Sequence, residues 1–303
     1  MSPSDYARRA ATLGGLILVL LLVAACAGSR RATAYQWDPS IFFDSLFAPD
    51  PRIIRGVLLT VAIAVTSQII GVVLGVLGAL GRISRVRPVR WLASGYVWVF
   101  RGTPLLVQLM IIYYGLLNTN ILRWDDITIG GFVILGSWQA GIFALGVNEG
   151  AYMTEIVRAG IIAIDPGQME AARSLGMTYR KAMRRIVLPQ AARVIVPPLG
   201  NEFNNMLKTT SLLTLLSVQE LFVTFQILNA NGPASFHPFE LFTACAIWFL
   251  LLTTIWSIIQ AQIEKRLAKG TPGAPAPGGP GLAARLFGLR RSTADIAPVT
   301  GAR

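Results

Sequence analysis

The feature that most constrains the fold of this chain is a series of long apolar runs with almost no charged residues. An α-helix rises about 1.5 Å per residue, so roughly 20 apolar residues cross the hydrocarbon core of a bilayer. We count six membrane-spanning helices, of which the fourth and fifth extend past their apolar runs. The sequence therefore predicts an all-α polytopic membrane protein. The runs occupy residues 10–29, 56–81, 102–122, 127–148, 186–201 and 241–263.

The positive charges indicate how these spans are oriented. The chain has 27 Lys and Arg residues against 15 Asp and Glu, a formal net charge of +12. With the N-terminus inside, 20 of the 27 basic residues fall in cytoplasmic segments and five in outer ones, while Arg101 and Lys208 lie in spans. Cytoplasmic loops of membrane proteins carry such an excess. We therefore predict a multi-pass membrane protein with both termini in the cytoplasm. Topology explains the charge better than nucleic-acid binding does.

The chain divides into three parts in this interpretation. Residues 1–52 form an N-terminal anchor helix and an outer loop, and residues 53–265 form the transmembrane domain. Residues 266–303 are rich in Gly and Pro, which predicts a flexible cytoplasmic tail.

The N-terminal run resembles a signal anchor because Arg8 and Arg9 precede it. The sequence Val-Ala-Ala-Cys that ends at Cys26 also resembles a lipoprotein cleavage box. We favour an uncleaved anchor, and lipidation of Cys26 stays open. Cys26 and Cys245 do not have the spacing of a metal-binding pair, and His237 is the single histidine. The sequence therefore gives little support to histidine-based catalysis or to a metal site.

Two further patterns concern the packing of the spans. The second span places small residues on one face at every fourth position, which lets helices approach closely in lipid. These residues are Ser67, Gly71, Gly75 and Ala79. In the third span, Gly102 predicts a break or bend, and Thr103 is placed to cap a new helix that begins at Pro104.

The basic stretch between the fourth and fifth spans predicts two short helices. Asp165 is placed to cap the first helix, with Pro166 at its first position and Gln168 three residues after the cap. Gly176 is placed to end this helix, and Thr178 to cap the second. Together they predict a short helix that lies parallel to the membrane in the cytoplasm. Its apolar ridge consists of Met169, Ala172 and Leu175.

This stretch resembles the EAA loop, the docking element of permease subunits in bacterial ABC importers. The resemblance rests on Glu170-Ala171-Ala172, Gly176 and Ile186-Val187-Leu188-Pro189 over residues 165–190. It implies that the loop transmits force from a separate ATPase. The residues that the resemblance assigns to this coupling are Gln168, Glu170, Ala171, Ala172, Leu175, Gly176, Leu188 and Pro189.

The resemblance extends over residues 53–265 and points to the importers of polar amino acids, such as histidine, glutamine, glutamate, arginine and opines. It implies a five-helix type I ABC importer permease core plus one N-terminal helix, which works by alternating access. The motifs that carry it are Phe100–Gln108, Asn148–Tyr152, Glu155–Gly160, Leu188–Ala191, Pro197–Leu199 and Lys208–Leu212.

The chain has no ATP site of its own, because no lysine follows a glycine and a Walker A sequence is therefore absent. We expect a transport subunit that is not an enzyme and binds no cofactor, with ATP and Mg²⁺ bound by the partner. The resemblance implies a cytoplasmic ATPase dimer, a second permease subunit, identical or related, and an extracytoplasmic solute-binding protein.

Polar residues within the spans are candidates for the substrate path, because ionisable groups in lipid are costly. These residues either line the path or form hydrogen bonds between helices, and the sequence favours neither role over the other. Glu155 and Arg158 are spaced for a local ion pair, and Glu149 and Glu202 have no assigned role. Arg101 is expected to extend to the inner interface. The candidates are Asn148, Tyr152 and Glu155 on the fourth span and Asn201, Asn204, Asn205 and Lys208 on the fifth.

Three other functions have less support from the sequence. An ion-driven transporter usually shows internal repeats, which are not seen here, and would leave the docking loop without a purpose. The two motifs at Arg101 and Asn148 argue against an ABC permease for an osmolyte or a metal. A membrane-embedded enzyme lacks a recognisable set of catalytic residues. The sequence does not reveal which amino acid is carried.

Overall fold

The structure, a computed structural model, describes residues 37–115, 123–231 and 234–268. The predicted first span, Cys26 and the predicted tail beyond residue 268 lie outside these residues. The chain divides into two units, Met1–Ser40 and Ile41–Arg303. In the first unit only residues 37–40 are described, and apart from the first two residues of α2 everything below concerns the second.

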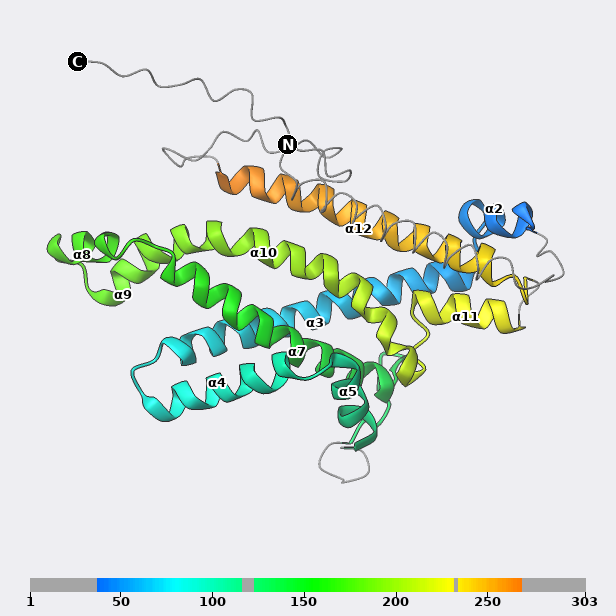
Figure 1. The fold of residues 1–303 in the computed structure, drawn as a ribbon, viewed down its shortest axis with the longest axis horizontal. Helices are drawn as coiled ribbons and strands as arrows, with labels where there is room; N and C mark the ends of the chain where they lie inside the picture. Colours follow the sequence, from blue (N-terminus) through cyan, green and yellow to red (C-terminus); the bar gives the residue numbers. More distant parts are fainter. Residues whose placement is uncertain (1–36, 116–122, 232–233, 269–303) are drawn as a thin grey trace, which may run out of the picture. The chain divides into compact units, whose positions relative to one another are not determined.

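The second unit is built almost entirely from helices (Figure 1). Within it, α8 and α9 project at the opposite end of the helices from α11 (Figure 1). The elements are α2 (Pro39–Phe47), α3 (Pro51–Ile83), α4 (Arg87–Gly102), α5 (Leu105–Met110), the π-helical η1 (Ile111–Gly115), β1 (Ile127–Ile129), β2 (Phe132–Ile134), α7 (Gly136–Ile162), α8 (Pro166–Ser174), α9 (Tyr179–Ala182), the π-helical η2 (Met183–Val187), α10 (Leu188–Thr209), the 3₁₀-helical η3 (Thr210–Leu216), α11 (Leu221–Asn231) and α12 (Pro238–Ala268).

Two of the described helices, α3 and α12, are long and apolar enough to cross a membrane on their own. Two bent helix pairs raise the number to four if each pair is one span. One pair, α4 with α5 and η1, bends by 106°, and the other, Tyr179–Leu216 with α11, bends by 49°. The all-α membrane fold is confirmed, whereas the predicted number of six spans is not.

The predicted fourth span was wrong at its start. Residues 127–134 form an antiparallel hairpin, and α7 begins only at Gly136. Gly130 and Gly131 have φ values of +57° and +84°, which is the backbone of a two-residue hairpin turn. An uncharged apolar run cannot by itself tell a strand from part of a helix, because both bury the same residue types.

A further helix, α11, was not predicted because 11 residues are too few for a span. It begins where Glu220, which is fully buried, accepts hydrogen bonds from the backbone N–H groups of Phe222 (3.0 Å) and Val223 (2.9 Å). The Thr60 hydroxyl donates to the same carboxylate at 3.3 Å and accepts from the Leu221 N–H. The start of α11 is therefore tied to α3.

The small-residue face of α3 packs closely against another helix, as the sequence predicted, and the structure identifies that partner as α7. Ser67, Gly71, Gly75 and Ala79 are all buried. A Cβ atom at Gly75 would lie 2.2 Å from Cβ of Met153 on α7, far inside van der Waals contact. Only glycine therefore allows the two helices to approach this closely, and they form the most extensive helix–helix contact of the described chain.

Two apolar cores hold the unit together. One lies among α3, α5, α7, α10 and η3 and includes Leu109, Leu145 and Leu213. The other lies among α3, α11 and α12, with Phe225 fully buried, and residues of α2 pack against it. The indole N–H of Trp248 also donates to the Ser45 carbonyl at 3.0 Å, which ties α12 to α2.

Candidate functional site: the coupling segment and the polar faces of α7 and α10

The coupling segment, which we define as residues 165–190, begins as the sequence predicted. The Asp165 carboxylate accepts a hydrogen bond from the Gly167 N–H at 2.9 Å, and Pro166 occupies the first turn of α8. Such a cap satisfies one of the N–H groups that a helix leaves without an internal partner.

The end of α8 also follows the prediction. Gly176 has a φ of +79°, and its N–H donates to the Arg173 carbonyl at 2.9 Å. The Met177 N–H donates to the Ala172 carbonyl at 3.1 Å, which completes a Schellman motif. The Thr178 hydroxyl then accepts from the Lys181 N–H at 3.4 Å and caps α9. The two short helices, α8 and α9, are thus joined by a tight turn.

The residues predicted for ATPase coupling lie in two environments. Ala172 is buried, while Leu175 is 80% exposed, so the predicted apolar ridge is not one continuous face. Gln168 accepts from the amide of Gln190 at 3.3 Å, which links α8 to the start of α10. Leu175 and the neighbouring Tyr179 leave an apolar surface open at the turn between the helices. Glu170, Ala171, Gly176, Leu188 and Pro189 are exposed as well.

On α7, Asn148 is buried and holds the break between α4 and α5. Its amide donates to the Phe100 carbonyl at 3.1 Å and to the Gln108 side-chain carbonyl at 2.9 Å. Gln108, which ends the Phe100–Gln108 motif but received no predicted role, donates in turn to the Phe100 carbonyl (2.9 Å) and to the Thr103 hydroxyl (2.7 Å). Carbonyls at a helix end need such partners. Thr103 therefore accepts a hydrogen bond at the break. The prediction that it caps α5 was wrong, because the cap position of α5 is Pro104.

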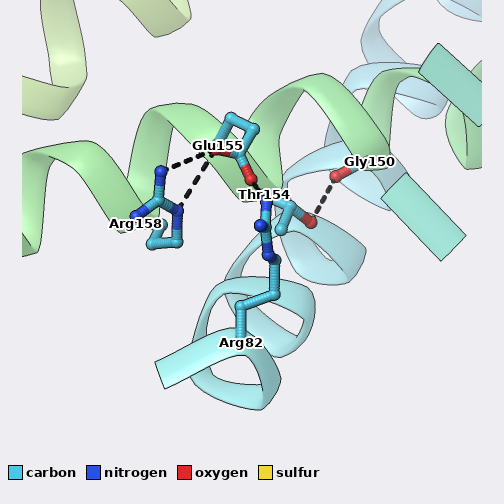
Figure 2. Close-up of polar contacts among 5 residues, drawn as sticks. All are labelled: Arg82, Gly150, Thr154, Glu155 and Arg158. Carbon is cyan, nitrogen blue, oxygen red and sulfur yellow. Dashed lines mark hydrogen bonds and ion pairs between the residues drawn. The ribbon is translucent and has the colours of Figure 1, made fainter. Parts of the chain in front are cut away.

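Tyr152 and Glu155 each contact arginine side chains. The Arg101 guanidinium lies 5.1 Å from the centre of the Tyr152 ring, within the range of a cation–π contact. Glu155 pairs with Arg158, as predicted, at 2.9 Å, and also with Arg82 on α3 (Figure 2). The sequence did not predict the Arg82 contact, because 73 residues separate the partners along the chain.

On α10, the candidate residues fall into a buried and an exposed group. Asn204 is partly buried, and its side-chain oxygen has no hydrogen-bond partner among the described residues. Asn201, Asn205 and Lys208 are exposed, and their spacing places them on one face, the polar face of α10. Asn201 accepts from Gln260 of α12 at 3.2 Å. In the described chain no hydrogen bond joins the α7 candidates to those on α10.

Glu149 and Glu202 lie apart from the candidate residues. Glu149 is buried on α7 against Gly71, and its Oε1 atom has no hydrogen-bond partner within the described ranges. Glu202 lies on α10 and is partly buried.

Comparison with known proteins gives consistent matches. The chain is 38% identical over 262 residues to the arginine transport system permease protein ArgU of Corynebacterium glutamicum, covering 84% of this chain and 79% of that protein. It is 37% identical over 239 residues to the L-cystine transport system permease protein TcyB of Bacillus subtilis, covering 78% of this chain and 95% of that protein.

Solved structures show the same fold. A crystal structure of an amino acid ABC transporter with histidines matches with a TM-score of 0.62 and 38% identity, covering 71% of this chain and 94% of that chain. An inward-facing structure of the MetNI methionine ABC transporter matches with a TM-score of 0.57 and 18% identity, over 72% of this chain and 97% of that chain. The second match concerns the fold alone.

The family described as binding-protein-dependent transport system inner membrane component matches residues 71–269, which is more than half of the chain. The relatives and the fold agree with this match. The chain therefore belongs to the family of binding-protein-dependent transport system inner membrane components.

Proposed function

We propose that the chain is the membrane permease subunit of an ATP-driven importer of amino acids. Its relatives are transport system permeases for arginine and cystine, and its 38% identical structural match is an amino acid ABC transporter. The chain supplies the passage across the cytoplasmic membrane and carries out no chemistry itself. ATP and Mg²⁺ bind to a partner ATPase, and a solute-binding protein delivers the amino acid from outside.

The observation that carries this proposal is the coupling segment. Its two capped helices project beyond the ends of α7 and α10, and they leave Leu175 and Tyr179 exposed. A rigid turn with an apolar tip suits insertion into a cleft of another protein, since such anchors dominate binding energy. Because α8 is joined to α7 and α10 through short connections, a push on the segment reaches both helices. Closure of the ATPase dimer then drives alternating access.

In this proposal the coupling segment and both termini lie in the cytoplasm. The positive charges favour this orientation, and the permease acts as a dimer because two ATPase subunits each need a docking segment. The second half is a second copy of this chain or a related permease.

The polar face of α10 lines the passage in this proposal. Asn201, Asn205 and Lys208 offer amides and a cation at one exposed face of a membrane helix. The α7 candidates contribute differently. Asn148 is hydrogen-bonded at the break between α4 and α5, and Glu155 forms ion pairs with two arginines. Tyr152, which is partly exposed beside Arg101, remains available to a solute.

The experiment that tests the function is a pull-down from membranes with this chain as bait. We expect a cytoplasmic ATPase to be recovered with the wild-type chain and lost when Leu175 and Tyr179 are both replaced by Asp. Replacement of Asp44, an exposed residue of α2, by Lys serves as the control and should leave recovery unchanged. Recovery of the chain without an ATPase, under conditions in which known importers stay assembled, would favour an ion-driven transporter instead.

A further inference from the structure

The turn between α3 and α4 carries three exposed arginines, Arg85, Arg87 and Arg90, which we call the basic turn. None of them forms an ion pair in the part of the chain that the structure describes. The Arg90 guanidinium donates a hydrogen bond of 3.5 Å to the Ser84 carbonyl, which leaves its charge without a counter-ion. Residues 51–124 contain no Asp or Glu, so the two helices joined by this turn supply no anion themselves. Like charges this close repel one another, and an anionic ligand relieves that repulsion.

The carboxylate that does reach the end of α3 is already engaged. Glu155 of α7 pairs with Arg82, three residues before the basic turn, and also with Arg158 (Figure 2). Two guanidinium groups share its single negative charge. The positive charge of the basic turn is therefore not neutralised from α7.

The helix that follows the basic turn exposes an apolar face. Within the described ranges, Val97 is the single buried residue of α4. Trp91 and Trp98 stand seven residues apart on one face, and they are 70% and 78% exposed. Gly95 lies between them on that face, with open space where a side chain would stand. The cationic start of α4 therefore continues into an exposed apolar surface, the Trp91–Trp98 face.

The two features together fit one kind of molecule. An anionic phospholipid has a phosphate, which a guanidinium binds through its fork of N–H donors, and acyl chains that cover apolar side chains. Clusters of Lys and Arg beside a membrane helix bind such lipids, and Trp is enriched where membrane and water meet. A soluble protein could contact the arginines, but Trp98 lies about 16 Å along the helix from Arg87, inside the span.

We propose that the basic turn and the Trp91–Trp98 face bind an anionic phospholipid, with its phosphate on the arginines and its acyl chains along the tryptophans. This partner goes beyond the proposed function, which assigns no role to the turn. The turn lies at the same end of the helices as α8 and α9 (Figure 1). The leaflet rests on the proposed function: because the coupling segment is cytoplasmic there, the lipid belongs to the inner leaflet.

Quenching of tryptophan fluorescence by brominated lipid tests this contact. The full-length chain is reconstituted into phosphatidylcholine vesicles that contain a minor share of phosphatidylglycerol. The acyl chains of either the phosphatidylglycerol or an equal amount of the phosphatidylcholine are brominated. The signal of α4 is the difference between the wild type and the variant that combines Trp91→Phe with Trp98→Phe. Brominated phosphatidylglycerol should quench this signal at least about twofold more, since each nearby arginine favours an anionic headgroup. Equal quenching by the two lipids would overturn the proposal.

Variants separate the role of the charges from a change in folding. Arg87→Gln combined with Arg90→Gln should abolish the preference for phosphatidylglycerol, whereas Arg87→Lys with Arg90→Lys keeps the charges and should retain it. The matched control, Lys265→Gln with Arg266→Gln, removes two charges from the last turn of α12, on the same side in the proposed topology. It should be quenched as the wild type is, and all three double variants should keep the wild-type melting temperature. A preference that survives in the Arg87→Gln, Arg90→Gln variant would contradict the headgroup contact.

Two other results would assign the basic turn to a different ligand and would also overturn the proposal. Loss of the preference when inorganic phosphate replaces chloride at equal ionic strength would indicate a soluble anion. Loss of the ATPase from a pull-down with the Arg87→Gln, Arg90→Gln variant, with the lipid preference unchanged, would indicate a protein. Failure to recover an ATPase with the wild-type chain would instead remove the proposed function, while a measured lipid preference of α4 would stand.

Discussion

Arg82, in the last turn of α3, forms an ion pair with Glu155 in the C-terminal third of α7, and Arg158 binds the same carboxylate from one turn further along (Figure 2). Two guanidinium groups therefore share one carboxylate, and all three side chains are only partly exposed. The pair links the two helices that pack most extensively, and one of them, α7, leads into the segment that is proposed to receive force from the ATPase.

This contact predicts a measurable coupling between α3 and α7. Glu155→Gln should lower the free energy of unfolding by about 1–2 kcal/mol, because it leaves two positive charges without their partner, with solvent exposure limiting the loss. Arg82→Gln should cost about 1 kcal/mol. In a double-mutant cycle measured by thermal unfolding in detergent, the two losses should not add. Additive losses would show that the pair contributes nothing to the contact between the helices.

The close approach of α3 and α7 predicts a steric effect at Gly75. Its added methyl group in Gly75→Ala would meet Cβ of Met153 at 2.2 Å, so the helices must separate or shift. We expect a loss of about 1–3 kcal/mol, the usual cost of overpacking. Gly95→Ala on α4 is the control, because a Cβ there meets nothing within 4 Å. A melting temperature for Gly75→Ala equal to that of Gly95→Ala would contradict the observed packing.

Local signals in the sequence predicted the local structure well. The caps at Asp165 and Thr178, and the end of α8 at Gly176, depend on the chemistry of a few neighbouring residues, which the sequence displays directly. The apolar runs at α3 and α12 were predicted for a similar reason, since length and composition decide whether a helix spans a membrane.

Contacts between distant residues could not be predicted. Nothing near Asn148 in the sequence shows that its amide reaches Phe100 and Gln108 of another helix. The pairing of Arg82 with Glu155 is similar, because helical spacing identifies partners three or four residues apart and no others. The hairpin at residues 127–134 was not predicted, because an apolar run alone does not distinguish a strand from part of a helix. Which polar residues face a passage is decided by such contacts.

The structure predicts that Asn148 acts mainly on stability. Asn148→Ala removes two hydrogen bonds and leaves the Gln108 carbonyl buried without this donor, a loss of about 1–3 kcal/mol. We expect a lower melting temperature, while Asn231→Ala, an exposed amide of α11, should leave it unchanged. A variant with wild-type stability and a raised KM for uptake would instead place Asn148 in the substrate path.

The coupling segment predicts a charge effect at Glu170, which is exposed on α8 two residues before the buried Ala172. Glu170→Lys keeps a long polar side chain but reverses its charge at the surface proposed to enter the ATPase cleft. Because the caps of α8 do not involve this side chain, the segment should fold and the chain should insert normally. Uptake and stimulation of the partner's ATPase should both fall at least tenfold, about 1.4 kcal/mol in coupling free energy. Asp44→Lys, the same reversal on α2, should leave both at wild-type levels. Normal uptake by Glu170→Lys would exclude this side chain from the docking surface, whereas loss of membrane insertion would show that its effect is on folding.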